Sequence, residues 1–263
     1  MLATGRRSRI VEELRANGTA RVSELAVLLS VSEMTIRRDV EALEETGLLE
    51  KVHGGAQLPG GARAEEPGFD TKLVRDESEK NAIAQEAAAL VSSGSAIGLG
   101  AGTTTWTLAK HLWRVPDLTV VTNSPRIADV FHRRKAQDPV HGATVILTGG
   151  ERTLSDALVG PIAISALGQL HLDLLFLGAH GVDEKAGFTT PNLLEAETNR
   201  AFSAQAQLTA VLADHTKWGK VGMSTILPLS EADVFVSDDG LAPSARETLS
   251  ASVGRVLIAT MER

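Results

Sequence analysis

An abrupt change of pattern divides this 263-residue chain near residues 56–70, where the segment AQLPGGARAEEPGFD interrupts every apolar repeat. Prolines and glycines recur in the segment, which is typical of a linker. Before it, apolar residues recur at helical spacing in short runs. After it, short Val, Ile, Leu and Ala runs alternate with amphipathic stretches, which predicts a parallel α/β sheet. We therefore expect an N-terminal domain over 1–58, a linker over 59–75 and an α/β domain over 76–263.

The composition excludes several classes of protein. The chain has no Cys, so it can form neither disulfides nor thiolate metal sites. A lack of disulfides is common in cytosolic proteins. The seven histidines have no metal-ligand spacing, and we expect neither a metal nor another cofactor. No apolar run reaches the roughly 18 residues that a membrane helix requires, and the first residues hold no apolar signal core. These features favour a cytoplasmic globular protein.

The charge is unevenly divided between the two parts of the chain. The whole chain has a formal net charge of −7, which by itself disfavours nucleic acid as a partner. Residues 1–58, however, carry 8 Lys and Arg against 9 Asp and Glu, and most of the negative charge lies after them. Because DNA binding needs only a local basic face, the charge leaves that partner open.

Three short helices and a wing are predicted in the first domain. Apolar residues at helical spacing in 10–14, 22–29 and 36–43 give the helices, with Ser23 expected to cap the second and Ser32 the third. Two short helices joined by a tight turn form a helix-turn-helix unit. The two following runs, 48–52 and 56–58, flank a Gly-Gly turn and predict a two-stranded wing.

The third helix has the polarity of a recognition helix. Its first turn offers Thr35, Arg37 and Arg38, whereas Glu41 and Glu45 crowd its far end. This order is expected when only the N-terminal half of a helix enters the major groove, where arginine contacts guanine or phosphate. The alternative is that these arginines are ordinary solvated side chains.

A candidate anion site follows the first strand of the second domain. Gly100–Thr105 places small residues and hydroxyls between a strand (95–99) and a helix (103–112), and Gly102, Thr103 and Thr104 lie where an anion would meet a helix N-terminus. A tight turn with a capping Thr explains the same residues equally well. A dinucleotide fingerprint and a P-loop are excluded, because the third Gly and the Gly-Lys-Ser/Thr sequence are missing.

Other polar loops follow the later strands. In a parallel sheet these strand ends converge on one edge, where ligands bind. Their Thr, Asn, Gly and Lys residues suit a phosphorylated polyol, and a Lys is the natural partner of a phosphate unless it is only a solvated surface residue. The candidate effector-binding residues from these loops are Asn123, Gly149, Gly150, Gly181, Asp183 and Lys217.

The segment 22–56 resembles the DNA-binding domain of DeoR-type transcription regulators. The residues that carry the resemblance are Val31–Ser32, Thr35–Asp39, Leu43–Glu44, Gly47 and His53–Ala56. The resemblance implies that Ser32, Thr35, Arg37 and Arg38 contact operator DNA. We expect Lys51 and His53 of the wing to lie near the DNA backbone. Asp39 is expected to orient an arginine, since phosphate repels a carboxylate.

The second domain resembles the DeoR-type sensor domain, whose fold is similar to ribose-5-phosphate isomerase and which detects sugar phosphates. The matching segments are Gly102–Thr104, Val121–Ser124, Gly149–Gly150, Phe176–Ala179, Thr189–Asn192 and Ala213–Lys217. Two positions depart from the family pattern, since Gly100 stands where Asp is frequent and Asn199 where Lys is common. These changes are expected to alter the effector or to move its charge contact to Arg200 or Lys217.

These features predict a homo-oligomeric, two-domain regulator: a winged helix-turn-helix that binds double-stranded operator DNA and an α/β sensor for a phosphorylated sugar. We expect repression that the sugar phosphate relieves. The rival hypothesis is a sugar-phosphate isomerase with Asp183 or Glu197 as base, although Asn199 replaces the lysine that such chemistry would use. A third possibility is a DNA-binding scaffold whose sensor no longer binds a ligand.

Overall fold

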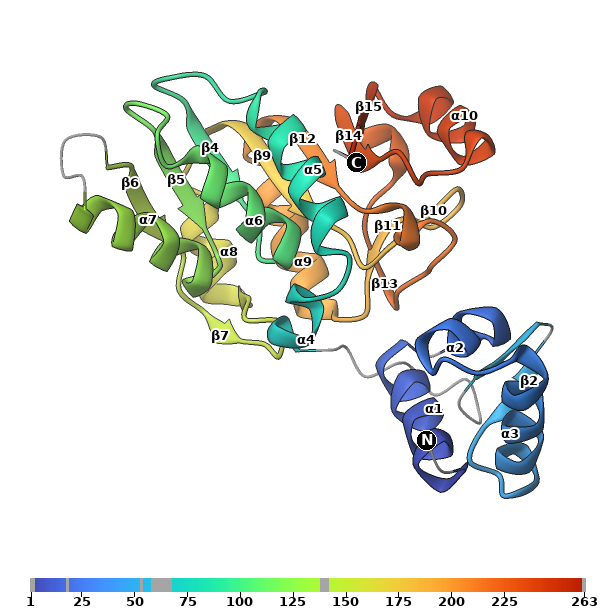
Figure 1. The fold of residues 1–263 in the computed structure, drawn as a ribbon. Helices are drawn as coiled ribbons and strands as arrows, with labels where there is room; N and C mark the ends of the chain where they lie inside the picture. Colours follow the sequence, from blue (N-terminus) through green and yellow to red (C-terminus); the bar gives the residue numbers. More distant parts are fainter. Residues whose placement is uncertain (1–2, 18, 53, 58–67, 138–141, 262–263) are drawn as a thin grey trace. The chain divides into compact units, whose positions relative to one another are not determined.

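The computed structural model describes residues 3–17, 19–52, 54–57, 68–137 and 142–261 (Figure 1). The chain forms two compact units, residues 1–67 and 68–263. Within the described ranges, no helix is long and apolar enough to cross a bilayer.

The first unit is a winged helix-turn-helix, as the sequence predicts. Its elements in chain order are α1 Ala3–Asn17, β1 Thr19–Arg21, α2 Val22–Leu28, α3 Glu33–Glu45, β2 Glu50–Val52 and β3 Gly55–Gln57. The helices enclose a small apolar core that includes Ile10, Leu25 and Ile36. The wing has three strands instead of two, in the order β1–β3–β2. The additional strand β1 is too short to show an alternating pattern in the sequence.

Local chemistry sets the ends of these elements. Ser32 caps α3 as predicted, because its side chain accepts a hydrogen bond from the backbone N–H of Thr35. The predicted cap of α2 is wrong, because Arg21 and not Ser23 occupies the N-cap position, and the Glu24 carboxylate accepts the Arg21 backbone N–H at 3.2 Å. Gly55 permits the pairing of β1 with β3, since a Cβ there would lie 2.3 Å from the Ala20 carbonyl oxygen.

The second unit is built on a seven-stranded parallel sheet with the order β15–β14–β12–β9–β4–β5–β6. This confirms the predicted α/β class. The strands are β4 Ala96–Leu99, β5 Thr119–Thr122, β6 Thr144–Leu147, β9 Leu172–Gly178, β12 Ala206–Leu212, β14 Val234–Asp238 and β15 Arg255–Ala259. An antiparallel sheet of three strands and a short hairpin add β10 Gly181–Asp183, β11 Gly187–Thr190, β13 Ser224–Leu227, β7 Glu151–Arg152 and β8 Leu158–Val159.

Helices cover both faces of the large sheet. One core packs α5 Glu77–Ala88, α6 Thr103–Leu112 and α7 Pro125–Gln137 against one face, and another packs α8 Pro161–Leu167, α9 Leu193–Ser203 and α10 Pro243–Ser252 against the other. The central strand β9 shows the period of two that this arrangement requires. Leu174 and Phe176 enter the first core, whereas Leu175 and Leu177 enter the second.

The predicted linker over 59–75 is too long, because residues Phe69–Leu73 form the helix α4. Phe69 is only 3% exposed and meets the ring of Trp106 edge to face, with centroids 6.1 Å apart. One buried aromatic side chain therefore fixes a helix of five residues, a length at which the sequence shows no helical period. Residues 58–67, which include the predicted end of the first domain, lie outside the described part of the chain.

Candidate DNA-binding and effector sites

The start of α3 presents the residues that the sequence assigns to DNA binding. The hydroxyls of Ser32 and Thr35 lie 2.9 Å apart and share a hydrogen bond, so both are held at the first turn. Arg37 is exposed and donates to the Glu33 carboxylate at 3.2 Å. Arg38 is exposed and has no hydrogen bond or ion pair with any described residue. Arg38 can therefore contact a phosphate or a base without first breaking an ion pair with a described residue, unlike Arg37.

Asp39 joins two helices and does not face solvent. Its carboxylate is 2% exposed and pairs with the guanidinium groups of Arg6 and Arg7 on α1. Burial acts to raise the pKa of Asp39, but the two arginines outweigh it, and the pKa lies below its ordinary value. The expectation that Asp39 orients an arginine agrees with these contacts, which involve two arginines.

The wing is attached to the acidic end of α3. The Lys51 ammonium lies 3.0 Å from a carboxylate oxygen of Glu41, and its backbone N–H donates to Glu44 at 3.1 Å. Lys51 would have to leave Glu41 to reach a phosphate. His53, the other predicted wing residue, lies outside the described residues.

In the second unit, the parallel strands place the loops after β4, β9 and β12 side by side, because these strands are neighbours in the sheet. The loop after β4 is fixed by the Thr105 hydroxyl, which donates to the Gly100 and Gly102 carbonyls at 2.7 and 3.1 Å. Thr103 and Thr104 at the start of α6 are almost buried, and neither hydroxyl has a partner among the described residues. These two hydroxyls are available to a ligand.

The amide of Asn123 serves the fold. Its Oδ1 accepts the backbone N–H of Ala101 at 2.8 Å, and its Nδ2 donates to the Leu158 carbonyl at 3.1 Å. Asn123 therefore links the Gly100–Gly102 loop to the hairpin strand β8. Both ends of the amide are occupied, so its effect on a ligand would be to hold that loop in place.

Backbone geometry explains several of the other predicted positions. Gly149 and Gly150 have φ of +75° and +122°, and a Cβ on Gly150 would lie 2.5 Å from the Val159 carbonyl oxygen. A Cβ on Gly181 would lie 2.1 Å from the Lys220 carbonyl oxygen. These glycines are required by tight turns and close strand contacts whether or not a ligand binds.

Asp183 caps the turn between β10 and β11. Its Oδ1 accepts the backbone N–H groups of Lys185 and Ala186, each at 2.9 Å. These hydrogen bonds lower the pKa of the carboxyl group. Glu197, the other acid of the isomerase hypothesis, is exposed on α9. Neither carboxyl group is buried in a catalytic pocket, and the cap alone explains Asp183.

Lys217 belongs to a charged cluster with Asp214 and Lys80. The Asp214 side chain is fully buried, its Oδ2 has no hydrogen bond, and the Lys217 ammonium lies 3.6 Å from that oxygen. Burial acts to raise the pKa of Asp214, but Lys217, the hydrogen bond from Thr216 and Lys80 outweigh it and lower the pKa. Asp214 is therefore a buried anion that keeps two lysines nearby.

Lys80 is a member of the cluster that the sequence analysis missed. Its side chain is 4% exposed, and its ammonium donates to the carbonyls of Lys72 and Arg75. Burial, followed by the charge of Lys217, lowers its pKa. The signal was present in the sequence, because Lys80 continues the buried stripe of α5 that Ile83, Ala84 and Ala87 form at helical spacing.

His180 is a partly buried imidazole near several lysines. Burial and then the charges of Lys217, Lys72 and Lys220 lower the pKa of its imidazole to about 4. A neutral imidazole among several lysines is an environment that favours an anion. The strand order places His180, which follows β9, between the Gly100–Gly102 loop and Asp214.

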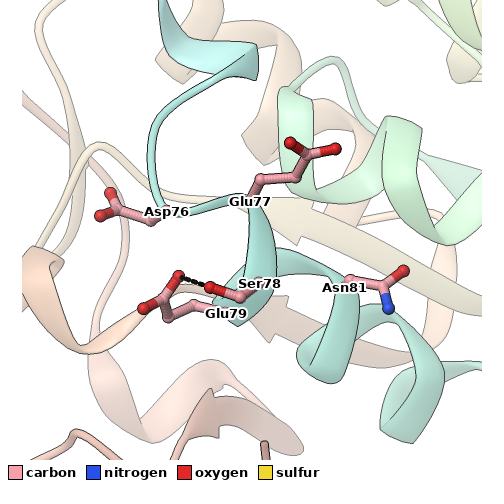
Figure 2. A pocket seen from close by; sticks show the side chains of 5 residues that line it. All are labelled: Asp76, Glu77, Ser78, Glu79 and Asn81. Atoms are coloured by element: carbon pink, nitrogen blue, oxygen red, sulfur yellow. Dashed lines mark hydrogen bonds between the residues drawn. The ribbon is translucent and has the colours of Figure 1, made fainter. Parts of the chain in front are cut away.

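A nearby hollow has the opposite character. It measures about 660 Å³ and is lined by Asp76, Glu77, Ser78, Glu79 and Asn81 (Figure 2). Its acidic side chains, Asp76, Glu77 and Glu79, would repel a phosphate. The charges therefore favour the region of Lys217 and His180 as the anion site over this acidic hollow.

The two departures from the family pattern are neighbours in space. A Cβ on Gly100 would lie 3.7 Å from Oδ1 of Asn199 and 2.7 Å from a terminal methyl group of Leu177. The Asn199 amide has no hydrogen-bond partner among the described residues. With Gly100 in place of Asp and Asn199 in place of Lys, the region next to the Gly100–Gly102 loop lacks the two charges that the family pattern would place there.

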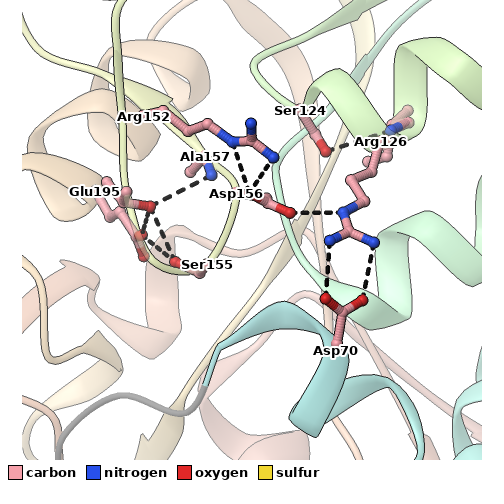
Figure 3. A network of polar contacts seen from close by, with 10 residues as sticks. Asp70, Ser124, Arg126, Arg152, Ser155, Asp156, Ala157 and Glu195 are labelled. Carbon is pink, nitrogen blue, oxygen red and sulfur yellow. Dashed lines mark hydrogen bonds and ion pairs between the residues drawn. The ribbon is translucent and has the colours of Figure 1, made fainter.

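A polar network links the strand-end loops to α4 (Figure 3). Arg126, three residues after Asn123, pairs with Asp156 of the β7–β8 turn and with Asp70 of α4. On the other side of the turn, Thr153 and Ser155 donate to the almost buried Glu195 carboxylate of α9. None of these residues was singled out from the sequence, because their partners are distant along the chain.

Comparison with known proteins places both units in one family. Residues 6–60 match the DeoR-like helix-turn-helix domain, and residues 75–239 match the DeoR C terminal sensor domain. The chain is 36% identical to an uncharacterized HTH-type transcriptional regulator, YgbI, of Escherichia coli over the full length of both proteins. It is 35% identical to the HTH-type transcriptional regulator GlpR of Haloferax volcanii, over 96% of each chain.

Two further similarities are to a curated repressor and to a solved structure. The chain is 31% identical to the lactose phosphotransferase system repressor of Staphylococcus epidermidis, covering 88% of this chain and 90% of that one. Among solved structures, ribose 5-phosphate isomerase A of Methanocaldococcus jannaschii matches 54% of this chain and 55% of its own, at 19% identity and a TM-score of 0.41. The chain thus spans about half the length of that isomerase, and the match concerns the fold alone.

Proposed function

This chain belongs to the DeoR family of DNA-binding transcription regulators, and we propose that it represses carbohydrate-metabolism genes until a phosphorylated sugar binds its second unit. The family consists of regulators and not of enzymes, so the isomerase hypothesis is set aside. The proposal has two parts, an operator contact and an effector site, and each rests on its own residues.

For the effector, the supporting observation is the charged cluster of Lys217, Asp214 and Lys80. Lys217 and Lys80 lie at the strand edge with the orphaned carboxylate oxygen of Asp214, and the unpartnered hydroxyls of Thr103 and Thr104 lie at the helix start two strands away. A phosphate bound there would meet the Lys217 ammonium, the buried Lys80 would add positive potential, and the sugar hydroxyls would meet the threonines. Asn123, Gly149, Gly150, Gly181 and Asp183 then support the loops without a direct contact to the effector.

For DNA, the support is the unpaired Arg38 at the start of α3. We propose that Ser32, Thr35, Arg37 and Arg38 enter the major groove, and that Lys51 and His53 approach the backbone. In a homo-oligomer, the DNA-binding units of two copies would occupy two operator half-sites. Effector binding would favour an arrangement that no longer fits them, and such couplings are typically about 1–3 kcal/mol.

The test is fluorescence anisotropy with DNA from the gene's own promoter region, titrated at fixed salt. Glucose 6-phosphate, ribose 5-phosphate and glycerol 3-phosphate would be added in turn. We expect specific binding that one of these compounds weakens about tenfold, which corresponds to about 1.4 kcal/mol. Specific binding that none of a wider set of sugar phosphates changes would contradict the effector part of the proposal.

A variant pair locates the effector site. Lys217→Met should abolish the response to the active compound and leave operator affinity without effector unchanged. Lys185→Met, which removes an exposed lysine of the β10–β11 turn, is the matched control and should respond normally. An equal loss of response in both variants would mean that net charge, and not a bound phosphate at Lys217, explains the effect.

A further inference from the structure

The large sheet ends at an edge strand, β6, whose own residues provide none of the usual protection against further strand pairing. β6 pairs with β5 on one side, and no other described strand pairs with it. Its four residues contain no charge and no proline, and Ile146 and Leu147 are 38% and 44% exposed. Natural sheets usually protect such an edge with Lys, Pro, a bulge or a covering element, because unpaired backbone groups recruit further strands. We therefore expect another protein segment to pair with or cover the exposed edge of β6.

An uncharged helix surface adjoins this edge. Residues 157–170 contain no charged side chain, although they include α8. On α8, Ile162 is 68% exposed, and Ser165 and Ala166 follow it at helical spacing. These residues border a hollow of about 450 Å³, which Pro161, Ile162, Ser165, Ala166 and Gln169 line.

The edge strand and the helix form one surface. The Ile162 Cγ2 methyl group would lie 3.6 Å from a Cβ on Gly149, which follows β6 by two residues. Ile146, Ile162, Ser165 and Ala166 are defined here as the β6–α8 face, and Leu147 flanks the same strand edge from the other side of the sheet, where Val145 packs. It combines unpaired backbone groups, exposed apolar side chains and small residues, the combination on which another sheet and helix can pack closely.

Charge identifies the occupant as a second copy of the chain. The chain carries a net charge of −7, so two copies repel each other over most of their surfaces. The β6–α8 face has no charge, so two copies meet there without like-charge contacts. Because the face has no charged side chain, it has no group that would recognise a nucleic acid or a charged peptide. An edge strand is also self-complementary, because antiparallel pairing with its own copy satisfies the backbone groups of both strands.

We propose that the β6–α8 face is the dimer interface, in which β6 pairs antiparallel with β6 of the second copy and the two α8 helices pack beside it. The pairing joins the two large sheets into one continuous sheet. This assignment rests on the proposed function, because binding to two operator half-sites requires two DNA-binding units. It adds the surface that pairs them.

The experiment is light scattering coupled to size-exclusion chromatography on the full chain at micromolar concentration. We expect the wild type to have at least the mass of two copies. Ile162→Glu and Ile146→Lys each place charge on the face, and each should halve the mass. Leu208→Glu, at an apolar residue of β12 that is 48% exposed, is the matched control and should keep the wild-type mass. Circular dichroism checks that all three variants fold, as is expected because each replaced side chain is at least partly exposed.

Failure of the interface is distinguishable from failure of the proposed function. A monomeric wild type, or a wild-type mass in either Ile162→Glu or Ile146→Lys, overturns the interface even if the chain binds promoter DNA specifically. Conversely, both variants can become half as large while the wild type binds no specific DNA. That result would support the interface and contradict the regulator.

Discussion

Arg126 holds Asp70 through two parallel hydrogen bonds, Nη1 to Oδ1 at 2.9 Å and Nη2 to Oδ2 at 3.0 Å (Figure 3). Asp70 lies on α4, the first helix of the second unit, and Arg126 lies in the first turn of α7, the helix that follows Asn123. The same guanidinium pairs with Asp156, whose pKa is lowered because the hydrogen bonds from Arg126 and Arg152 outweigh its burial. Helix α4 is thus attached to the loops of the proposed effector site.

We expect Asp70→Asn to loosen α4 without unfolding the second unit. The Asp70 side chain is 75% exposed, so the ion pair is worth about 0.5–1 kcal/mol. Amide exchange in residues 69–75 should therefore be about two- to fivefold faster, as hydrogen exchange with mass spectrometry measures. Asp129→Asn, at an exposed residue of α7, is the control. Unchanged exchange in Asp70→Asn would show that Phe69 packing alone holds α4.

Arg38→Ala should weaken operator binding and leave effector binding unchanged. Loss of a base or phosphate contact from arginine typically costs about 1–3 kcal/mol. Arg9→Ala removes an exposed arginine of α1 and is the control for net charge. Anisotropy with promoter DNA measures both variants at one salt concentration. Equal affinities of Arg38→Ala and the wild type would place the recognition surface elsewhere.

Asp39→Asn should destabilise the first unit, because it leaves Arg6 and Arg7 without their buried anion. Breaking a buried ion pair typically costs about 3 kcal/mol or more. The pKa of Asp39 is lowered in the folded state, so its contribution is complete above the ordinary pKa and is lost as the pH falls through the lowered value. Chemical denaturation at neutral pH, with Glu45→Gln as control, measures the loss. A change below 1 kcal/mol would contradict this role.

His180 should make the second unit less stable in mild acid. Its pKa falls from 6.5 to about 4 on folding, so the unfolded chain binds more protons between these values, and stability decreases as the pH drops from 6.5 toward 4. Between pH 7 and pH 5 the loss is of the order of 1–2 kcal/mol. His180→Gln should reduce this loss in denaturation experiments at the two pH values. An imidazole that titrates near 6.5 by NMR would exclude the proposed lysine environment.

Gly100→Asp and Asn199→Lys should be coupled. Gly100→Asp alone forces a methyl group of Leu177 to move and places a carboxylate beside the Asn199 amide, so it should be destabilising. The double variant should recover part of that loss through a new ion pair, with a coupling energy of about 0.5–3 kcal/mol. A double-mutant cycle from chemical denaturation measures it. Additive effects would show that the two side chains do not meet.

The winged helix-turn-helix, the parallel α/β sheet and the family could all be predicted from the amino-acid sequence. Each is encoded over short distances along the chain, as in the Ser32 cap, the stripe of α3 and the alternation of strand and helix. The resemblance also depends on contiguous residues such as Thr35–Asp39. The secondary-structure pattern and the family resemblance can therefore both be recognised without knowing which distant segments contact each other.

The roles of the polar residues, in contrast, depend on contacts between distant parts of the chain. Asn123 and Asp183 are committed to backbone groups, and Lys80, which the sequence analysis did not select, joins Lys217 at Asp214. The partners in such contacts are many residues apart, and the order of the strands decides which loops are neighbours. A side chain's partners and burial set its charge and availability, and neither is fixed until the sheet has formed.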